Sequence, residues 1–200
     1  MTTNESSQAR ERVLNAAERL FNQRGYTAVT LRDIANELDI KQASLYHHVP
    51  GGKEQLFIEV TERTLRRHRT GLEQAIAGAG DGIEAQLHAA GAWLLSQPPM
   101  DLVRMTYSDM PAIDQVHAQR LSQDTYDALL GPIEAAIEQA HARGEIVVKN
   151  AGLIAGGVLG MIESLHAVPQ HVFEYGPEYE RQAMARELIN TLLNGLRPRS

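Results

Sequence analysis

The stretch that most constrains the fold of this chain is Thr30–Val49, in which two helical patterns are separated by a very short turn. The first pattern places apolar side chains three and four residues apart, and it follows Thr30 with Asp33 in its first turn. This spacing predicts an amphipathic helix that begins at about Thr30 and is capped by the hydroxyl and the carboxylate. Asp39 follows that helix, and Asp is one of the few residues besides Gly that tolerate a left-handed turn conformation. The chain is therefore expected to bend at Asp39.

The second pattern is shorter, and its apolar residues define one face of a helix: Ile40, Leu45 and Val49. Ala35 is small, so the two helices can approach each other closely. Two helices joined in this way form a helix-turn-helix, whose second helix can lie in the major groove of DNA. The sequence Pro50-Gly51-Gly52 is expected to end the second helix.

Apolar residues at helical spacing predict further helices on both sides of this stretch, interrupted by Gly and Pro. In the long helical pattern over 113–143, Gly131-Pro132 predicts a kink or a break, because proline removes a backbone donor. No segment alternates apolar and polar residues as a strand does, so the expected fold class is all-α. A boundary is expected after residue 52, which separates an N-terminal three-helix helix-turn-helix domain, 1–52, from a larger helical domain, 53–200, with 53–70 as the connecting helix.

Composition and charge narrow the class of protein further. The 200 residues include no cysteine, which excludes disulfides and thiolate metal sites. The polar start and the absence of an apolar run near the ~18 residues that span a bilayer lead us to expect a cytoplasmic protein. The net charge is −6, divided as +2 over residues 1–70 and −8 over the remainder. This charge argues against nonspecific coating of DNA and is typical of a protein in which only the N-terminal part approaches phosphate.

The apolar helix that follows Asn150 is rich in glycine, with Gly156, Gly157 and Gly160 near its centre. Each glycine lowers helix stability by about 1 kcal/mol, so close helix packing is expected to compensate. This packing has two interpretations: a homodimer interface formed with the last helix as a four-helix bundle, or an ordinary core within one chain. Spacing alone favours neither interpretation.

The N-terminal pattern resembles the DNA-binding domain of the TetR family of bacterial transcriptional regulators. The resemblance covers about a third of the chain and depends on residues 8–24, on Ser44-Leu45-Tyr46-His47-His48 within 30–49, and on Lys53-Glu54-Gln55-Leu56. The chain departs from the family pattern at Asp39, where Gly is usual, and at Lys41, where a small hydroxyl residue is usual. Its Pro50-Gly51-Gly52-Lys53 segment is one residue longer than the commonest pattern and resembles a subgroup with a PGGK loop.

The resemblance implies a role for each matching residue. The residues expected to face base edges are Lys41, Gln42, Ala43 and Tyr46, because Gln can pair with adenine, Lys with guanine, and Ala or Tyr can contact a thymine methyl. The residues expected to hold phosphates are Thr30, Arg32, Ser44, His47, His48 and Lys53. For Tyr46 or His48 alone, packing in the core is the alternative. The larger domain is then expected to bind a ligand, and the resemblance favours homodimerisation through about 150–168 and 177–197.

The larger domain contains Met and aromatic residues suited to a pliable apolar pocket for a small-molecule effector. These candidates are Trp93, Met105, Tyr107, Met110, Tyr126, Met161, His166 and Phe173. Each is individually more typical of a core residue. The histidines are not spaced as metal ligands, and no triad, phosphate-binding loop or carboxylate pair suggests an enzyme, so neither a metal, a cofactor nor catalysis is expected.

These observations together predict a ligand-responsive transcriptional regulator that binds a palindromic operator in double-stranded DNA as a homodimer. It is expected to be a repressor that a small molecule releases. The alternative is a DNA-binding regulator that is controlled by a protein partner or that is independent of any ligand.

Overall fold

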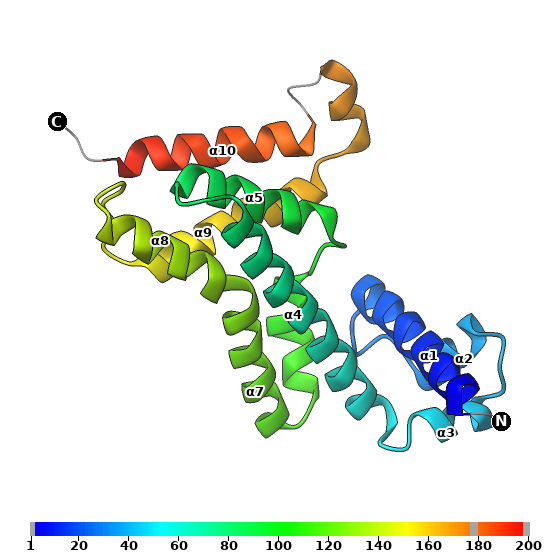
Figure 1. The fold of residues 1–200 in the computed structure, drawn as a ribbon. Helices are drawn as coiled ribbons and strands as arrows, with labels where there is room; N and C mark the ends of the chain where they lie inside the picture. Colours follow the sequence, from blue (N-terminus) through cyan, green and yellow to red (C-terminus); the bar gives the residue numbers. More distant parts are fainter. Residues whose placement is uncertain (1–2, 177–179, 198–200) are drawn as a thin grey trace. The chain divides into compact units, whose positions relative to one another are not determined.

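The structure, a computed structural model, describes residues 3–176 and 180–197, and this part of the chain contains helices and no strand (Figure 1). The first elements along the chain are α1 (Thr3–Arg24), α2 (Leu31–Glu37), α3 (Gln42–His48) and α4 (Gly52–Gly78). They are followed by α5 (Ile83–Ser96), α6 (Leu102–Arg104), the π-helical turn η1 (Met105–Asp109), the 3-10 turn η2 (Met110–Ala112) and α7 (Gln115–Thr125). The remaining elements are the π-helical turn η3 (Tyr126–Leu130), α8 (Gly131–Ala142), α9 (Ala151–Ser164), the 3-10 turns η4 (Leu165–Ala167) and η5 (Gln170–Tyr175), and α10 (Arg181–Leu196). The predicted all-α class is confirmed.

The chain forms two compact units, one of residues 1–64 with 100–124 and the other of residues 65–99 with 125–200. This division differs from the boundary expected after residue 52. The first half of α4 lies with the N-terminal unit because Leu56 and Val60 are buried in the same core as α1. Met105 and Met110 join that core too, so the segment from α6 to α7 also belongs to the first unit.

The first unit is held by an apolar core in which three aromatic rings meet. The ring centroids of Phe21 and Phe57 are 5.3 Å apart in an edge-on arrangement, and those of Tyr26 and Phe57 are 4.8 Å apart. Ile34 and Leu45 are fully buried, and α1, α2 and α3 contact one another. Aromatic pairs with these geometries add to the stability given by area burial alone.

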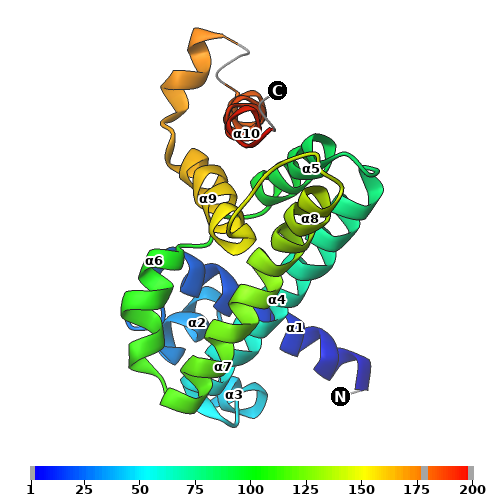
Figure 2. The same cartoon turned by 90° about the vertical axis from the view of Figure 1, so that its left-hand side faces the viewer.

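In the second unit, α5 contacts α8, α9 and α10, and α9 also contacts α8 and α10 (Figure 2). The close approach depends on Gly91 of α5, where a Cβ atom would lie 3.3 Å from Ile189 Cδ1 and 3.4 Å from Ile162 Cδ1. The helical pattern over 113–143 is interrupted by the π-helical turn η3 just before Pro132. A π-helical turn is one of the ways in which a helix accommodates a residue that disrupts its hydrogen bonds, and the expected kink or break takes this form.

None of the helices in the described part of the chain is both long enough and apolar enough to cross a bilayer.

Candidate nucleic-acid interface

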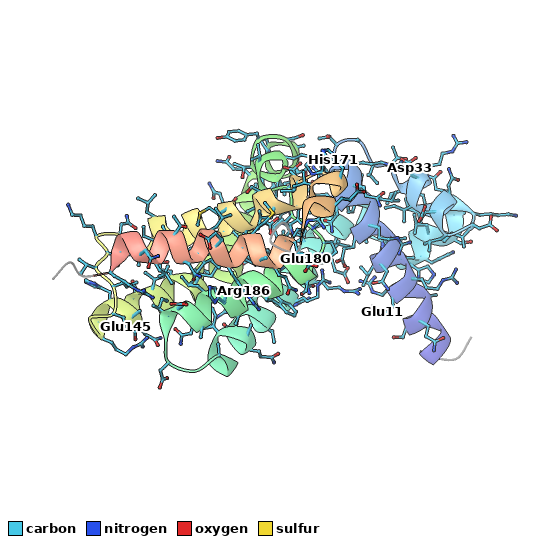
Figure 3. The ribbon with its side chains drawn as sticks, turned by 90° about the horizontal axis from the view of Figure 1, so that it is seen from above. Glu11, Asp33, Glu145, His171, Glu180 and Arg186 are labelled. Atoms are coloured by element: carbon cyan, nitrogen blue, oxygen red, sulfur yellow. The ribbon has the colours of Figure 1, made fainter. Side chains whose placement is uncertain are left out.

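The first helix of the predicted helix-turn-helix, α2, begins with a complete capping box. Asp33 N donates to Thr30 Oγ1 at 3.2 Å, and Thr30 N donates to Asp33 Oδ2 at 2.8 Å. The Thr30 hydroxyl also donates to Asp33 Oδ2 at 2.6 Å. These hydrogen bonds from Thr30 lower the pKa of the Asp33 carboxyl, which lies at the start of α2 (Figure 3). The predicted cap is confirmed, and it sets the point at which α2 begins.

The turn between α2 and α3 is a Schellman motif with Asp39 in the left-handed region, at φ +53°. Ile40 N donates to Ala35 O at 3.0 Å, and Asp39 N donates to Asn36 O at 3.1 Å. These are the two hydrogen bonds that close such a motif and satisfy the last carbonyls of the helix. The predicted bend at Asp39 is confirmed. Lys41 precedes α3 without a capping hydrogen bond from its side chain.

One face of α3 is buried and the other is exposed. Leu45 is fully buried, whereas the side chain of Tyr46 is 52% exposed. The other three residues predicted to face base edges are also exposed: Lys41, Gln42 and Ala43. The apolar face anchors α3 on the core of the first unit, so the polar face is open for contact with another molecule.

The residues predicted to hold phosphates lie in two kinds of environment. Arg32, Ser44 and His47 are exposed, as is Thr30, although the Thr30 hydroxyl is engaged in the cap. His48 is only half-exposed.

Lys53 is half-buried, and its Nζ donates to Tyr26 O at 3.0 Å and lies 4.0 Å from the centroid of the Tyr26 ring. Burial lowers the pKa of Lys53, and the negative charge of Asp109 opposes this shift. The structure therefore places Lys53 against Tyr26 as a contact within the unit, and its role at phosphate stays a prediction.

The C-terminal end of α3 is supported from behind by Arg10 of α1. Arg10 Nη1 donates to His48 O at 2.9 Å, and Arg10 Nη2 lies 2.7 Å from both carboxylate oxygens of Glu59. An arginine that joins a carboxylate and the last carbonyls of a helix restrains that helix in a defined orientation. Sequence reasoning missed Arg10 and Glu59, because the two residues are 49 positions apart in the chain.

The end of α1 and the turn after it are held by residues from η1 and α6. Arg104 Nη2 donates to Asn22 O at 2.8 Å and to Phe21 O at 3.2 Å. Tyr26 N donates to Oδ1 of Asp109, a carboxylate that is only 3% exposed, at 2.8 Å. Gly25 has φ +81°, and a Cβ atom there would lie 2.9 Å from Arg104 Cδ. A cation at the last carbonyls of α1 and a carboxylate on the following N–H fix the connection that leads into α2.

The residues predicted to line an effector pocket are divided between the two units. Met105 and Met110 are buried in the core of the first unit, and Tyr107 is 81% exposed. The second unit contains the other described candidates: Trp93, Tyr126, Met161 and His166. The side chain of Phe173 lies outside the described part of the structure. The predicted pocket therefore stays a prediction, and a cavity of about 610 Å³ in the second unit is lined by other residues.

Two titratable residues of that set have a shifted pKa, Tyr126 and His166. Burial and the positive charge of Arg181 lower the pKa of His166, and a backbone hydrogen bond with Leu94 opposes the shift. Among the described residues, no three His, Asp or Glu side chains gather in a way that could hold a metal ion.

Comparison with known proteins relates the candidate interface to a family. The family model for "Bacterial regulatory proteins, tetR family" matches residues 13–60, which include α2, α3 and the turn between them. The HTH-type transcriptional regulator LmrA of Bacillus subtilis (strain 168) is 39% identical over 82 residues, which are 40% of this chain and 44% of LmrA. The uncharacterised regulator YxaF of the same organism is 38% identical over 38% of this chain and 40% of its own length. The match thus spans less than half the length of these two relatives.

Over nearly the whole chain, the sequence identity to known proteins is lower, but the similarity of the fold is clear. The HTH-type transcriptional regulator AcrR of Shigella flexneri is 24% identical over 96% of this chain and 91% of AcrR. A solved protein of the tetR family from Rhodococcus RHA1 has a TM-score of 0.70 at 16% identity, and all of both chains is covered. A Saccharomonospora viridis protein solved in complex with choline has a TM-score of 0.71 at 22% identity, with 96% of this chain and 100% of that chain covered. At these identities the structures establish a shared fold.

Proposed function

Because the chain belongs to the TetR family of bacterial regulatory proteins, we propose that it is a transcriptional repressor that binds a palindromic operator as a homodimer. A small molecule that binds the second unit would release it from DNA. The observation that carries this proposal is the arrangement of α3, which is anchored by the buried Leu45 and presents Gln42, Ala43 and Tyr46 to solvent. A helix held from behind with a polar outer face is the arrangement that major-groove readout requires.

Each exposed residue of α3 can contribute chemistry that distinguishes bases. The Gln42 amide can pair in a bidentate manner with adenine, and Lys41 can donate to guanine. The methyl of Ala43 or the ring of Tyr46 can contact a thymine methyl. Arg32, Ser44 and His47 are exposed nearby in the sequence and would contact phosphates, which supply affinity and register without base specificity.

The proposed homodimer would pair α9 and α10 with their twofold mates. On α9, the side chain of Leu153 is 71% exposed, and a Cβ atom added at Gly157 or Gly160 would meet no other atom within 4 Å. These three residues recur at helical spacing and therefore share one face, while Val158 and Ile162 are buried within the chain. Exposed glycines on a helix face allow a second helix to approach closely, and this supports the dimer interpretation over the single-chain core.

For release, the coupling would pass through α4, because this helix contributes residues to both compact units. In the DNA-bound dimer the two copies of α3 would lie in successive major grooves about 34 Å apart. An effector that displaces α4 would change this separation. A coupling free energy of about 1–3 kcal/mol between the effector and the operator is sufficient for such regulation.

Substitution of Tyr46 tests the DNA-binding part of the proposal. An operator would first be selected from random duplex DNA with the purified protein, and its affinity would then be measured by fluorescence anisotropy. Tyr46→Ala should lower the affinity about 10- to 100-fold while the size of the protein in solution stays the same, since a good base contact contributes about 1–3 kcal/mol. Tyr107→Ala is the matched control, because Tyr107 is also an exposed tyrosine of the first unit. Unaltered operator binding by Tyr46→Ala would contradict the assignment.

The second candidate function is a regulator that responds to a protein partner or to no ligand. The exposure of Tyr107, a predicted pocket residue that is 81% exposed, favours this alternative. A screen of apolar and cationic compounds against the operator complex separates the two functions. A compound that weakens DNA binding supports the ligand-released repressor, and operator affinity that no compound changes supports the alternative.

A further inference from the structure

The second unit contains an open cavity of about 610 Å³ that none of the predicted pocket residues lines. Its walls come from the C-terminal part of α4, the segment leading into α5, the first turn of α5, and η3 with α8. Cavities of about 300–1,000 Å³ are typical of sites for small organic molecules, so this one is too large for a single ion.

The charged side chains of the cavity are mostly acidic. Three carboxylates line it, Glu73, Asp81 and Asp127, together with one guanidinium, Arg69. Arg69 Nε already donates to Glu73 Oε1 at 2.9 Å, and this bond and the charges of Glu73 and Asp127 raise the pKa of Arg69. The lining therefore has a surplus of two negative charges, and its one cation is paired within the protein.

Groups near the lining residues in the chain contribute charges of both signs. Arg143 Nη2 donates to the Asp81 carbonyl at 2.7 Å, whereas Tyr126 and Glu134 form a hydrogen bond close to Gly152 of α9. Tyr126 precedes Asp127 in η3, and its hydroxyl donates to Glu134 Oε2 at 2.5 Å. This hydrogen bond is the main cause of the raised pKa of Tyr126, with burial and the negative charges of Glu134, Glu138 and Asp127 also contributing. In addition, α4 ends at Gly78 beside the cavity, and the carbonyls at the C-terminus of a helix favour positive charge.

The rest of the lining supplies an apolar surface and one polar group without a partner. The apolar part consists of Ile76, Ala77, Pro132, Ala135 and Ala136. Gln86 is 7% exposed, and its Nε2 donates to Gly80 O at 2.7 Å, while its Oε1 has no hydrogen-bond partner. A buried acceptor without a donor is costly to the folded state.

We propose that this cavity is a binding site for a small organic cation, an ammonium compound with a short apolar arm. The ammonium group would lie among Asp81, Asp127 and Glu73, and the arm would lie against the alanines and Pro132. An anion would be repelled by the surplus carboxylates of the lining, so an anionic ligand is not expected to bind. The described residues gather no set of metal ligands that would favour a bare divalent ion. The site rests on this cavity alone and does not depend on the proposed regulation of DNA binding.

The test uses the full-length protein without DNA and three probes of similar size: benzylamine, benzyl alcohol and benzoate. Titration calorimetry at pH 7 should show that benzylamine, which is cationic, binds at least about fivefold more tightly than neutral benzyl alcohol, and that benzoate does not bind. Asp127→Asn and Asp81→Asn should each lower the benzylamine affinity about fivefold, because each removes one nearby negative charge. Glu187→Gln on α10 is the control, since Glu187 is exposed and does not line the cavity.

Arg69→Gln should change the benzylamine affinity in the direction opposite to the asparagine variants. A variant that is partly unfolded would not show such an increase. Removal of the only cation in the lining should raise the benzylamine affinity, with the melting temperature recorded for every variant. Equal affinity for benzylamine and benzyl alcohol, no binding of benzylamine, or benzylamine binding that neither asparagine variant weakens would each overturn the proposal. Because no DNA is present, none of these results depends on operator binding or release.

Discussion

At the scale of single residues, the buried carboxylate of Asp109 has a structural role outside the apolar core. It accepts the backbone N–H of Tyr26 at 2.8 Å, and its second oxygen lies 3.6 Å from Arg104 Nε. The acceptor for Tyr26 therefore comes from a residue 83 positions away. Through this bond Asp109 holds the turn from which the chain enters α2.

Substitutions of Asp109 test that role. Asp109→Ala leaves the Tyr26 N–H without its acceptor, so the free energy of unfolding measured with urea should fall by about 2–3 kcal/mol. Asp109→Asn keeps an acceptor oxygen and should lose less. A change below about 0.5 kcal/mol for Asp109→Ala would show that water or another group replaces the carboxylate.

The capping carboxylate of Asp33 predicts a dependence of stability on pH. Its folded-state pKa is lowered by the hydrogen bonds from Thr30, so its contribution is present above the unfolded carboxyl pKa of about 3.9 and is lost as the pH falls through the folded value. Asp33→Asn should therefore lower the urea midpoint at pH 7, and the difference from the natural protein should shrink below about pH 4. A difference of the same size at pH 7 and pH 3 would contradict this assignment.

At the scale of the elements, the two faces of α9 differ in packing. Ala155, Val158 and Ile162 are buried against neighbouring helices, whereas Gly157 and Gly160 are exposed beside open space. The inner face is explained by the fold of one chain. The outer face has no such explanation, and we assign it to the proposed dimer.

A bulky charge on the outer face of α9 should separate the dimer. Gly160→Arg places a cation where a second helix would have to approach, so light scattering after size exclusion should show a monomer at micromolar concentration. Gly78→Arg is the matched control, because Gly78 is also an exposed helical glycine with no atom within 4 Å of an added Cβ. A dimer that survives Gly160→Arg would place the interface elsewhere.

At the scale of the whole molecule, the net charge of −6 limits how strongly the protein can rely on electrostatic attraction to DNA. Two permanently charged residues are both exposed in the structure and proposed to contact DNA, Arg32 and Lys41. Two cations in each protomer release about four counterions per dimer, so the logarithm of the operator affinity should fall with the logarithm of salt concentration with a slope of about −4.

Lys53 provides the comparison for this slope. If Lys53 stays against Tyr26 in the complex, Lys53→Gln should leave the slope unchanged, and any loss of affinity should reflect a less stable first unit. If Lys53 instead contacts phosphate, six cations per dimer should give the natural protein a slope of about −5.4, which Lys53→Gln should reduce to about −3.6. Operator affinity measured between 50 and 200 mM salt, about the range over which such slopes are resolved, distinguishes the two outcomes.

The sequence predicted the elements whose causes are local. The cap formed by Thr30 and Asp33 joins residues three positions apart, and the left-handed turn at Asp39 depends on the residue type and its immediate neighbours. The buried face of α3, with Leu45 at its centre, follows from helical periodicity. Such features can be derived without knowing which distant segments meet.

Features that join distant segments could not be derived in this way. Periodicity predicts that Met105 and Met110 are apolar helix residues, but it does not say which core receives them, and the structure buries them with the N-terminal helices. Arg10 and Lys53 are charged residues whose partners, Glu59 and the Tyr26 carbonyl, are chosen only when the chain has folded.

The sequence by itself therefore determined that the described part of the chain is all-helical, where the helix-turn-helix begins and bends, and which residues of α3 are exposed. These properties depend on backbone preferences and helical spacing over a few residues. The tertiary structure decided how the chain divides into compact units, which polar side chains form long-range hydrogen bonds that hold α1 and α3, and where acidic side chains line a cavity. Those properties depend on contacts between residues tens of positions apart, and a pattern of local spacing contains no information about which of these residues meet.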